Sequence, residues 1–131
     1  MSKENVALYH QVFDAFNRRD LGAYLELMDA DVEAVPLRVA MVGDYHGHAG
    51  IRRWWENLLD VFPDFAVEVV EVRDLGDRTL AALRFGGHGA GSATPFEQAV
   101  WQLGEWREGK VVWWRAYGTE AEALEAAGVR E

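Results

Sequence analysis

The sequence of 131 residues contains no cysteine and only three prolines. Without cysteine, the chain has no disulfide bonds, no thiolate metal ligands and no cysteine nucleophile. Basic side chains are also scarce, because 13 Lys and Arg stand against 22 Asp and Glu and give a formal net charge of -9 at pH 7. Such a chain repels phosphate backbones and anionic lipid headgroups, so we expect neither nucleic acid nor a membrane as a partner.

Long apolar runs are missing as well. The stretch from Met1 to Asn5 is polar, and no segment offers the roughly 20 apolar residues of a membrane-spanning helix. We therefore expect a cytoplasmic protein. Half of the residues are apolar, which is the composition of a chain that folds around a core. This length suits one domain, which we expect to span 1–131.

The first half of the chain has the apolar spacing of helices. Apolar side chains recur every three or four positions at 2–19 and, most clearly, at 51–62, where Pro63 prevents a further turn. Asp20 is a suitable N-cap for a short helix between them, and a strand is predicted at 32–37.

The second half is predicted to be mostly strands. Alternating apolar residues and glycine-containing turns place strands at 65–72, 79–85, 96–106 and 111–117. A capping box that begins at Thr119 then opens a last short helix. Because helices and strands are segregated and the turns are short, the pattern predicts an α+β fold with an antiparallel sheet.

Five segments in this order and spacing carry a family likeness: FNRRDL at 16–21, YHGHAGIRRWW at 45–55, GKVV at 109–112, RAY at 115–117 and EALEAAG at 122–128. Together they resemble the SnoaL-like branch of the nuclear transport factor 2-like superfamily. The resemblance implies a cone-shaped roll, in which a curved antiparallel sheet wraps around the N-terminal helices and leaves an apolar cavity. Members include steroid isomerases, polyketide cyclases, epoxide hydrolases and non-catalytic transport factors, so the fold does not settle the function.

Six tryptophans give the expected cavity an aromatic character. Trp54 and Trp55 belong to the apolar stripe of the helix at 51–62, and the match to steroid isomerases places Trp101 and Trp114 on cavity-facing strand positions. Large rings favour a flat apolar or polycyclic ligand. The alternative is that the rings only fill the core. The residues expected to line the cavity are Tyr9, Phe13, Phe16, Met28, Val35, Trp54, Trp55, Leu58, Ala99, Trp101 and Trp114.

The resemblance does not supply the catalytic residues of a steroid isomerase. The positions that match its base, tyrosine and aspartic acid hold Val35, Val12 and Trp101, so isomerisation by that mechanism is not expected. The Asp-Arg-Asp trio of an epoxide hydrolase finds no clear counterpart either.

Glu97 and His46 are the two candidates for proton transfer. Glu97 has the strand parity of Trp101 and would face the cavity with it, where desolvation makes a carboxyl useful near neutral pH. The alternative is a solvated rim position. His46 would overhang the cavity mouth. With His48 it forms an H-x-H pair, but no third ligand is indicated, so we expect no metal and no cofactor.

A row of aromatic and basic residues is expected on the outer face of the sheet, where it would form a homodimer interface. The row comprises Arg84, His88, Gln102, Trp113, Arg115 and Tyr117. The alternative places Arg84 inside the cavity as an anion clamp.

Three functions remain open at this point. The protein is a cofactor-free isomerase, cyclase or hydrolase in which Glu97 or His46 moves a proton, a non-catalytic protein that binds a small apolar molecule, or an interaction module with a filled core.

Overall fold

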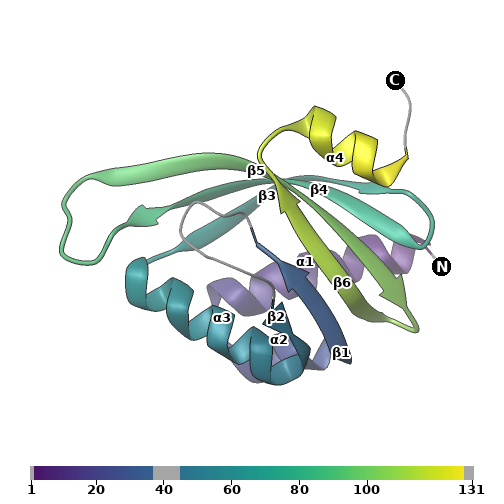
Figure 1. Cartoon of the computed structure of the whole chain (residues 1–131), viewed down its shortest axis with the longest axis horizontal. Coiled ribbons are helices and arrows are strands. Elements are labelled where there is room, and N and C mark those ends of the chain that lie inside the picture. The colour runs from purple at the N-terminus through teal and green to yellow at the C-terminus, as the bar shows by residue number, and fades with distance from the viewer. Residues whose placement is uncertain (1, 37–44, 129–131) are drawn as a thin grey trace.

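The computed structural model describes residues 2–36 and 45–128 (Figure 1). The order of elements is α1 (Ser2–Asn17), α2 (Leu21–Glu26), β1 (Met28–Val35), β2 (Tyr45–His46), α3 (Gly47–Val61), β3 (Ala66–Asp74), β4 (Arg78–His88), β5 (Pro95–Arg107), β6 (Lys110–Tyr117) and α4 (Glu120–Ala127). The α+β class and the curved sheet packed on helices are confirmed. No helix in the described part of the chain is both long and apolar enough to cross a bilayer.

The six strands form one sheet in the order β2-β1-β6-β5-β4-β3. The four long strands β3 to β6 are a meander of antiparallel pairs, as the short turns predicted. One pairing differs from the prediction, because β1 lies parallel to β6, with Ala34 opposite Trp114. The chain reaches β6 from β1 only after α3 and four other strands, and this long connection permits a parallel pair.

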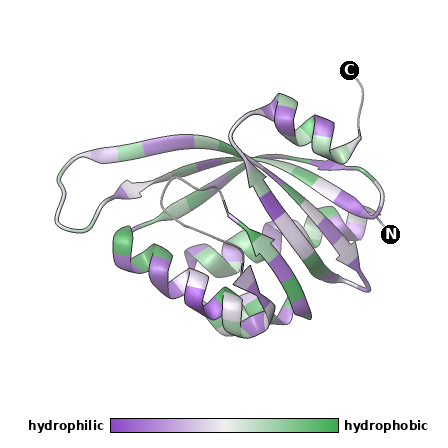
Figure 2. Ribbon diagram, in the orientation of Figure 1, coloured by the Kyte–Doolittle hydropathy of each residue, from purple (hydrophilic) through white to green (hydrophobic). Residues whose placement is uncertain are grey.

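The two faces of the sheet carry separate apolar clusters. Helices α1, α2 and α3 lie on one side of the sheet and α4 on the other (Figure 1). The inner cluster joins α1 and α3 to the concave face, and a smaller outer cluster joins α4 to β4 and β5. Apolar and polar residues alternate along α3 and the strands in Figure 2, as expected for elements with one buried face.

The last helix covers part of the outer face. The Thr119 side chain accepts a hydrogen bond from the Glu122 amide at 3.2 Å, which confirms Thr119 as the N-cap, and Gly128 ends the helix with a φ of 76°. Its buried side chains pack against Leu80 and Leu103. Part of the outer face is therefore occupied by the chain's own helix.

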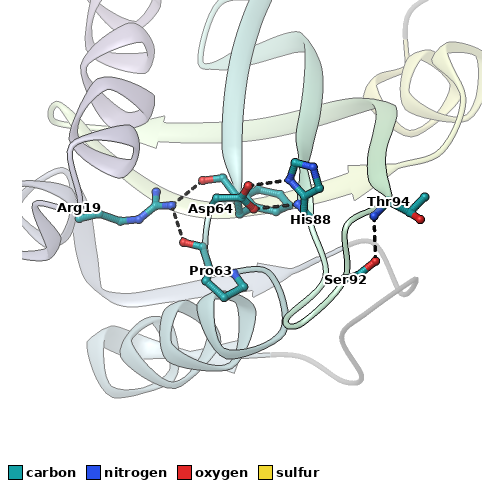
Figure 3. A network of polar contacts seen from close by, with 7 residues as sticks. Arg19, Pro63, Asp64, His88, Ser92 and Thr94 are labelled. Carbon is teal, nitrogen blue, oxygen red and sulfur yellow. Dashed lines mark hydrogen bonds and ion pairs between the residues drawn. The ribbon is translucent and has the colours of Figure 1, made fainter.

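Two side chains connect the end of α1 to the start of β3. The side-chain amide of Asn17 donates a hydrogen bond to the Val67 carbonyl at 2.8 Å and accepts one from the Val67 backbone N–H at 3.0 Å. The Arg19 guanidinium donates to the carbonyls of Pro63 and Phe65 at 3.2 and 2.7 Å (Figure 3). These bonds fix the first helix against one edge of the sheet.

Candidate functional site

A cavity of about 200 Å³ lies between α1, α3 and the inner face of the sheet. It exists because the curved sheet does not close fully onto the two helices, and the side chains that meet there are rings rather than flexible aliphatic chains. Fourteen described residues line it: Phe13, Phe16, Pro36, Trp54, Leu58, Phe62, Phe65, Val67, Phe85, Phe96, Gln98, Gln102, Trp114 and Ala116. Helices supply one side of the wall, and strands β3 to β6 supply the other.

The wall is mostly aromatic, and its rings contact one another. The Trp54 and Trp114 rings meet edge to face with their centroids 5.2 Å apart, and Phe62 and Phe96 lie 4.6 Å apart. Phe16 packs on Trp54 at 5.9 Å. Each wall ring is therefore held by another ring, so the space is a preformed hollow and not a gap between mobile side chains.

Two amide side chains are the main polar groups of the described wall. Gln102 is 7% exposed, and its Oε1 accepts a hydrogen bond from the Tyr9 hydroxyl on α1. Burial, with a smaller contribution from Tyr24, raises the pKa of Tyr9 well above its ordinary value, so the hydroxyl keeps its proton. Gln98 lies on the same face of β5 and is partly exposed.

The indole nitrogen of Trp114 is different from those of two nearby tryptophans. Trp106 Nε1 donates to Thr79 at 2.9 Å, and Trp113 Nε1 donates to Glu105 at 3.1 Å. Trp114 Nε1 is fully buried and finds no acceptor among the residues that the structure describes. Buried donors are almost always paired in folded proteins, so this nitrogen requires an explanation.

A polar clasp holds one end of the wall. Asp64 accepts from the His88 backbone amide at 2.7 Å and contacts the His88 ring at 2.8 Å (Figure 3). These hydrogen bonds from His88 lower the pKa of Asp64. Gly87 is needed beside them, since its φ is 149° and a Cβ there would lie 2.9 Å from the Asp64 carboxylate. The clasp joins the segment that carries Phe65 to the end of β4.

A SnoaL-like domain model matches residues 9–114, which is most of the chain. The chain belongs to the SnoaL-like family. No curated protein matches it.

Solved structures of low sequence identity share the fold of this SnoaL-like chain. A protein of unknown function from Burkholderia pseudomallei, described as nuclear transport factor 2-like, has a TM-score of 0.81 at 17% identity, over 93% of this chain and 95% of that one. A ketosteroid isomerase-like protein from Catenulispora acidiphila, in complex with trimethylamine, has a TM-score of 0.77 at 20% identity, over 94% and 93%. TerC, co-crystallised with polyporic acid, has a TM-score of 0.78 at 21% identity, over 93% and 96%.

The structure places five of the expected cavity residues in the wall of this SnoaL-like domain: Phe13, Phe16, Trp54, Leu58 and Trp114. Tyr9, Met28 and Trp55 are buried in the same core but outside the wall, and Tyr9 reaches it through Gln102. Val35 is the register partner of Arg115 and shares the outer face of the sheet with it. The next residue, Pro36, lines the cavity instead.

The expected orientation of β5 is wrong by one residue. Gln98 and Gln102 face the cavity and pair with Phe85 and Ala116, so the side chains of opposite parity on this part of β5 point to the outer face. Glu97, Ala99 and Trp101 are the three expected cavity residues that the structure turns outward. Gln102, which we expected in a dimer interface, is turned inward by the same shift.

Neither proton-transfer candidate reaches the cavity. Glu97 is exposed on the outer face. His46 lies 2.9 Å from the Glu33 carboxylate with 64% of its side chain exposed, and His48 contacts the Met28 carbonyl at 3.0 Å. No group of three metal-ligating side chains is found within residues 2–36 and 45–128.

Arg84 does not clamp an anion in the cavity. It forms an exposed ion pair with Glu68 at 3.0 Å on the outer face, which is the face we expected for it. Arg115 is exposed on the same face, and its guanidinium lies 5.9 Å from the centre of the Tyr117 ring. Trp113 and Tyr117 are partly covered because they pack against the cluster under α4.

Several wall residues were not predicted from the sequence: Pro36, Phe62, Phe65, Val67, Phe85, Phe96, Gln98, Gln102 and Ala116. Phe96 and Gln98 share the parity of Gln102, and the correct phase for β5 would have placed all three inside. Phe65 lies in the turn between α3 and β3, where periodicity gives no direction for a side chain, whereas Phe62 ends the apolar stripe predicted at 51–62 but was not assigned to the wall.

Proposed function

We propose that this protein binds a small uncharged molecule of one or two rings in the aromatic cavity, without catalysing its conversion. The observation that supports this most directly is the composition of the described wall, which holds apolar side chains and two neutral amides but no carboxylate, imidazole or guanidinium. Such a wall gains free energy by removing apolar surface from water, and it offers hydrogen bonds that orient a guest.

The cavity volume limits the size of the ligand. An engineered apolar cavity of about 150 Å³ admits benzene, whereas pockets for larger drug-like ligands span roughly 300–1,000 Å³. At about 200 Å³ this cavity falls between the two. A bicyclic molecule is therefore the expected guest, and a four-ring polycycle would require the wall to move.

Proton-transfer catalysis lacks its groups in the described wall. General acids and bases must lie within hydrogen-bond reach of the atom whose proton they move. Glu97 is on the other face of the sheet, and the exposed His46 pairs with Glu33 outside the cavity. Replacing either with glutamine is thus expected to leave ligand binding unchanged.

Naphthalene is a suitable probe because it is apolar, bicyclic and uncharged. We expect saturable binding, measured by quenching of tryptophan fluorescence, since Trp54 and Trp114 are part of the wall. Ala116→Phe places a ring inside the cavity and should abolish binding, whereas Ala99→Phe adds the same ring to the exposed outer face and should not. Equal binding by both variants would show that naphthalene binds elsewhere and would refute the proposal.

A further inference from the structure

We propose that the cavity selects ligands with a hydrogen-bond acceptor, of the cyclic ketone or quinone type, which binds where Gln102 and Trp114 meet. This selectivity rests on the proposed function and adds a chemical class to it. Each of the two side chains has a donor without a described acceptor, and the two lie on adjoining strands.

The first donor is Trp114 Nε1. Trp114 is 3% exposed, and its nitrogen is the one fully buried side-chain polar atom without a partner among the described residues. An indole N–H can only donate. The ring is part of the cavity wall but Nε1 has almost no accessible surface, so a small rotation of the indole is needed before an acceptor on a bound ligand can satisfy it, and a plain hydrocarbon cannot satisfy it.

The second donor is the amide nitrogen of Gln102. Its oxygen is engaged by the Tyr9 hydroxyl, which fixes the orientation of the amide. No described residue accepts a hydrogen bond from the remaining NH2 group, although the side chain is more than nine-tenths buried. Tyr9 therefore acts as a positioning residue that leaves the donor end of Gln102 to the cavity.

The two side chains come from diagonal positions on adjoining strands. Gln102 on β5 pairs with Ala116 on β6, and Trp114 precedes Ala116 by two positions on the same face. Diagonal neighbours of this kind are about 7 to 8 Å apart at the backbone, within reach of long side chains. Gln98 lies four residues away on β5, roughly 13 Å along the strand, and cannot bind the same atom.

The ligand is expected to carry a neutral acceptor. An amide and an indole donate hydrogen bonds but supply no positive charge, and the described wall contains no Lys, Arg or His. A buried carboxylate would lose its hydration without gaining a counter-charge. A carbonyl oxygen loses less and accepts both bonds, so ketones are favoured over acids of the same size.

The test compares two ligands of one skeleton, indane and 1-indanone, by calorimetric titration of the wild-type protein and two variants. The ketone should bind about tenfold more tightly to wild type, the effect of roughly one hydrogen bond. Trp114→Phe keeps an aromatic ring but removes the N–H, and should lower the preference for the ketone to the share that the Gln102 donor supplies. Trp55→Phe is the matched control, because Trp55 is buried outside the wall, and should keep the preference.

A spectroscopic readout separates hydrogen bonding from packing. In a ¹⁵N–¹H spectrum, the indole signal that disappears in Trp114→Phe should move downfield with 1-indanone and much less with indane. Equal affinities of wild type for the two ligands would overturn the inference while the proposed function stands. Failure of both ligands to bind would instead remove the proposed function and the inference with it.

Discussion

The hydroxyl of Tyr9 on α1 donates a hydrogen bond to Gln102 Oε1 on β5, across 93 residues of sequence. Both side chains are buried, and Gln102 is also part of the cavity wall. One bond therefore joins the first helix to the middle of the sheet and orients an amide toward the ligand space. The same pair therefore contributes to the stability of the fold and to the hydrogen-bonding properties of the cavity.

Removing only one partner of this hydrogen bond should destabilise the fold. Gln102→Leu leaves the Tyr9 hydroxyl buried without a partner and should lower the free energy of unfolding by about 1 to 3 kcal/mol, measured by urea denaturation. Adding Tyr9→Phe should recover part of the loss, because both polar groups are then gone. Gln98→Leu, at the partly exposed position on the same face, should cost less. Equal losses in Gln98→Leu and Gln102→Leu would contradict the role of the bond.

The clasp between Asp64 and His88 predicts an acid-dependent contribution to stability. The folded-state pKa of Asp64 lies below its ordinary value of 3.8, so the contribution is present above that pH and is lost as the pH falls through the folded pKa. Carbon-detected NMR titration should show that His88→Ala raises the pKa of Asp64 toward 3.8. His46→Ala, which removes a histidine paired with Glu33, should leave it unchanged.

Gly87 and Gly91 should differ in their tolerance of alanine. Both have a positive φ, of 149° and 75°, but only Gly87 is crowded, with the Asp64 carboxylate 2.9 Å from the position of a Cβ. Gly87→Ala combines strain with a clash and should destabilise the fold more than Gly91→Ala, whose cost is about 1 kcal/mol of backbone strain. Thermal unfolding of both variants measures the difference, and equal melting temperatures would count against the clasp geometry.

Homodimer formation stays a prediction. Only the part of the outer sheet face that α4 leaves uncovered is open to a second copy of the chain. Helix α4 covers Leu103 and part of Trp113, which leaves Arg84, Ala99 and Arg115 on the exposed part of the outer face. Sedimentation velocity at micromolar concentration should show a dimer that Ala99→Arg weakens, because the substitution adds bulk and a third positive charge. A wild-type monomer at these concentrations would contradict the predicted interface.

The helices were predictable because their buried stripes follow one rule of spacing. Ile51, Trp54, Trp55 and Leu58 recur at three and four residues, and all are buried on α3. The parallel pairing of β1 with β6 was not predictable, since nothing local to either strand specifies a partner more than 70 residues away. Leu37, the last residue of the predicted strand at 32–37, lies outside the described part of the chain.

The phase of β5 shows why the site was only partly predictable. Alternation offers two phases, and we placed Trp101 inside because the match to steroid isomerases put it on a cavity-facing strand position. The structure buries much of that ring on the outer face, where it pairs with Tyr117 and packs on the cluster under α4. The side chains that point inward include Gln102. This polar residue can be buried because the Tyr9 hydroxyl, on a helix distant in sequence, donates a hydrogen bond to it. The sequence of β5 alone indicates neither Tyr9 nor the cluster under α4, so it does not show which phase is correct.

The central claim is that the space enclosed by Phe16, Trp54 and Trp114 takes a guest molecule. The most direct measurement is a crystal structure of the protein soaked with 1-bromonaphthalene, in which anomalous scattering locates the bromine independently of the protein atoms. The account predicts one strong bromine peak inside the ring of wall residues, with the indoles of Trp54 and Trp114 against the bicycle. A cavity without a peak, or a peak confined to the outer face beneath α4, would contradict it.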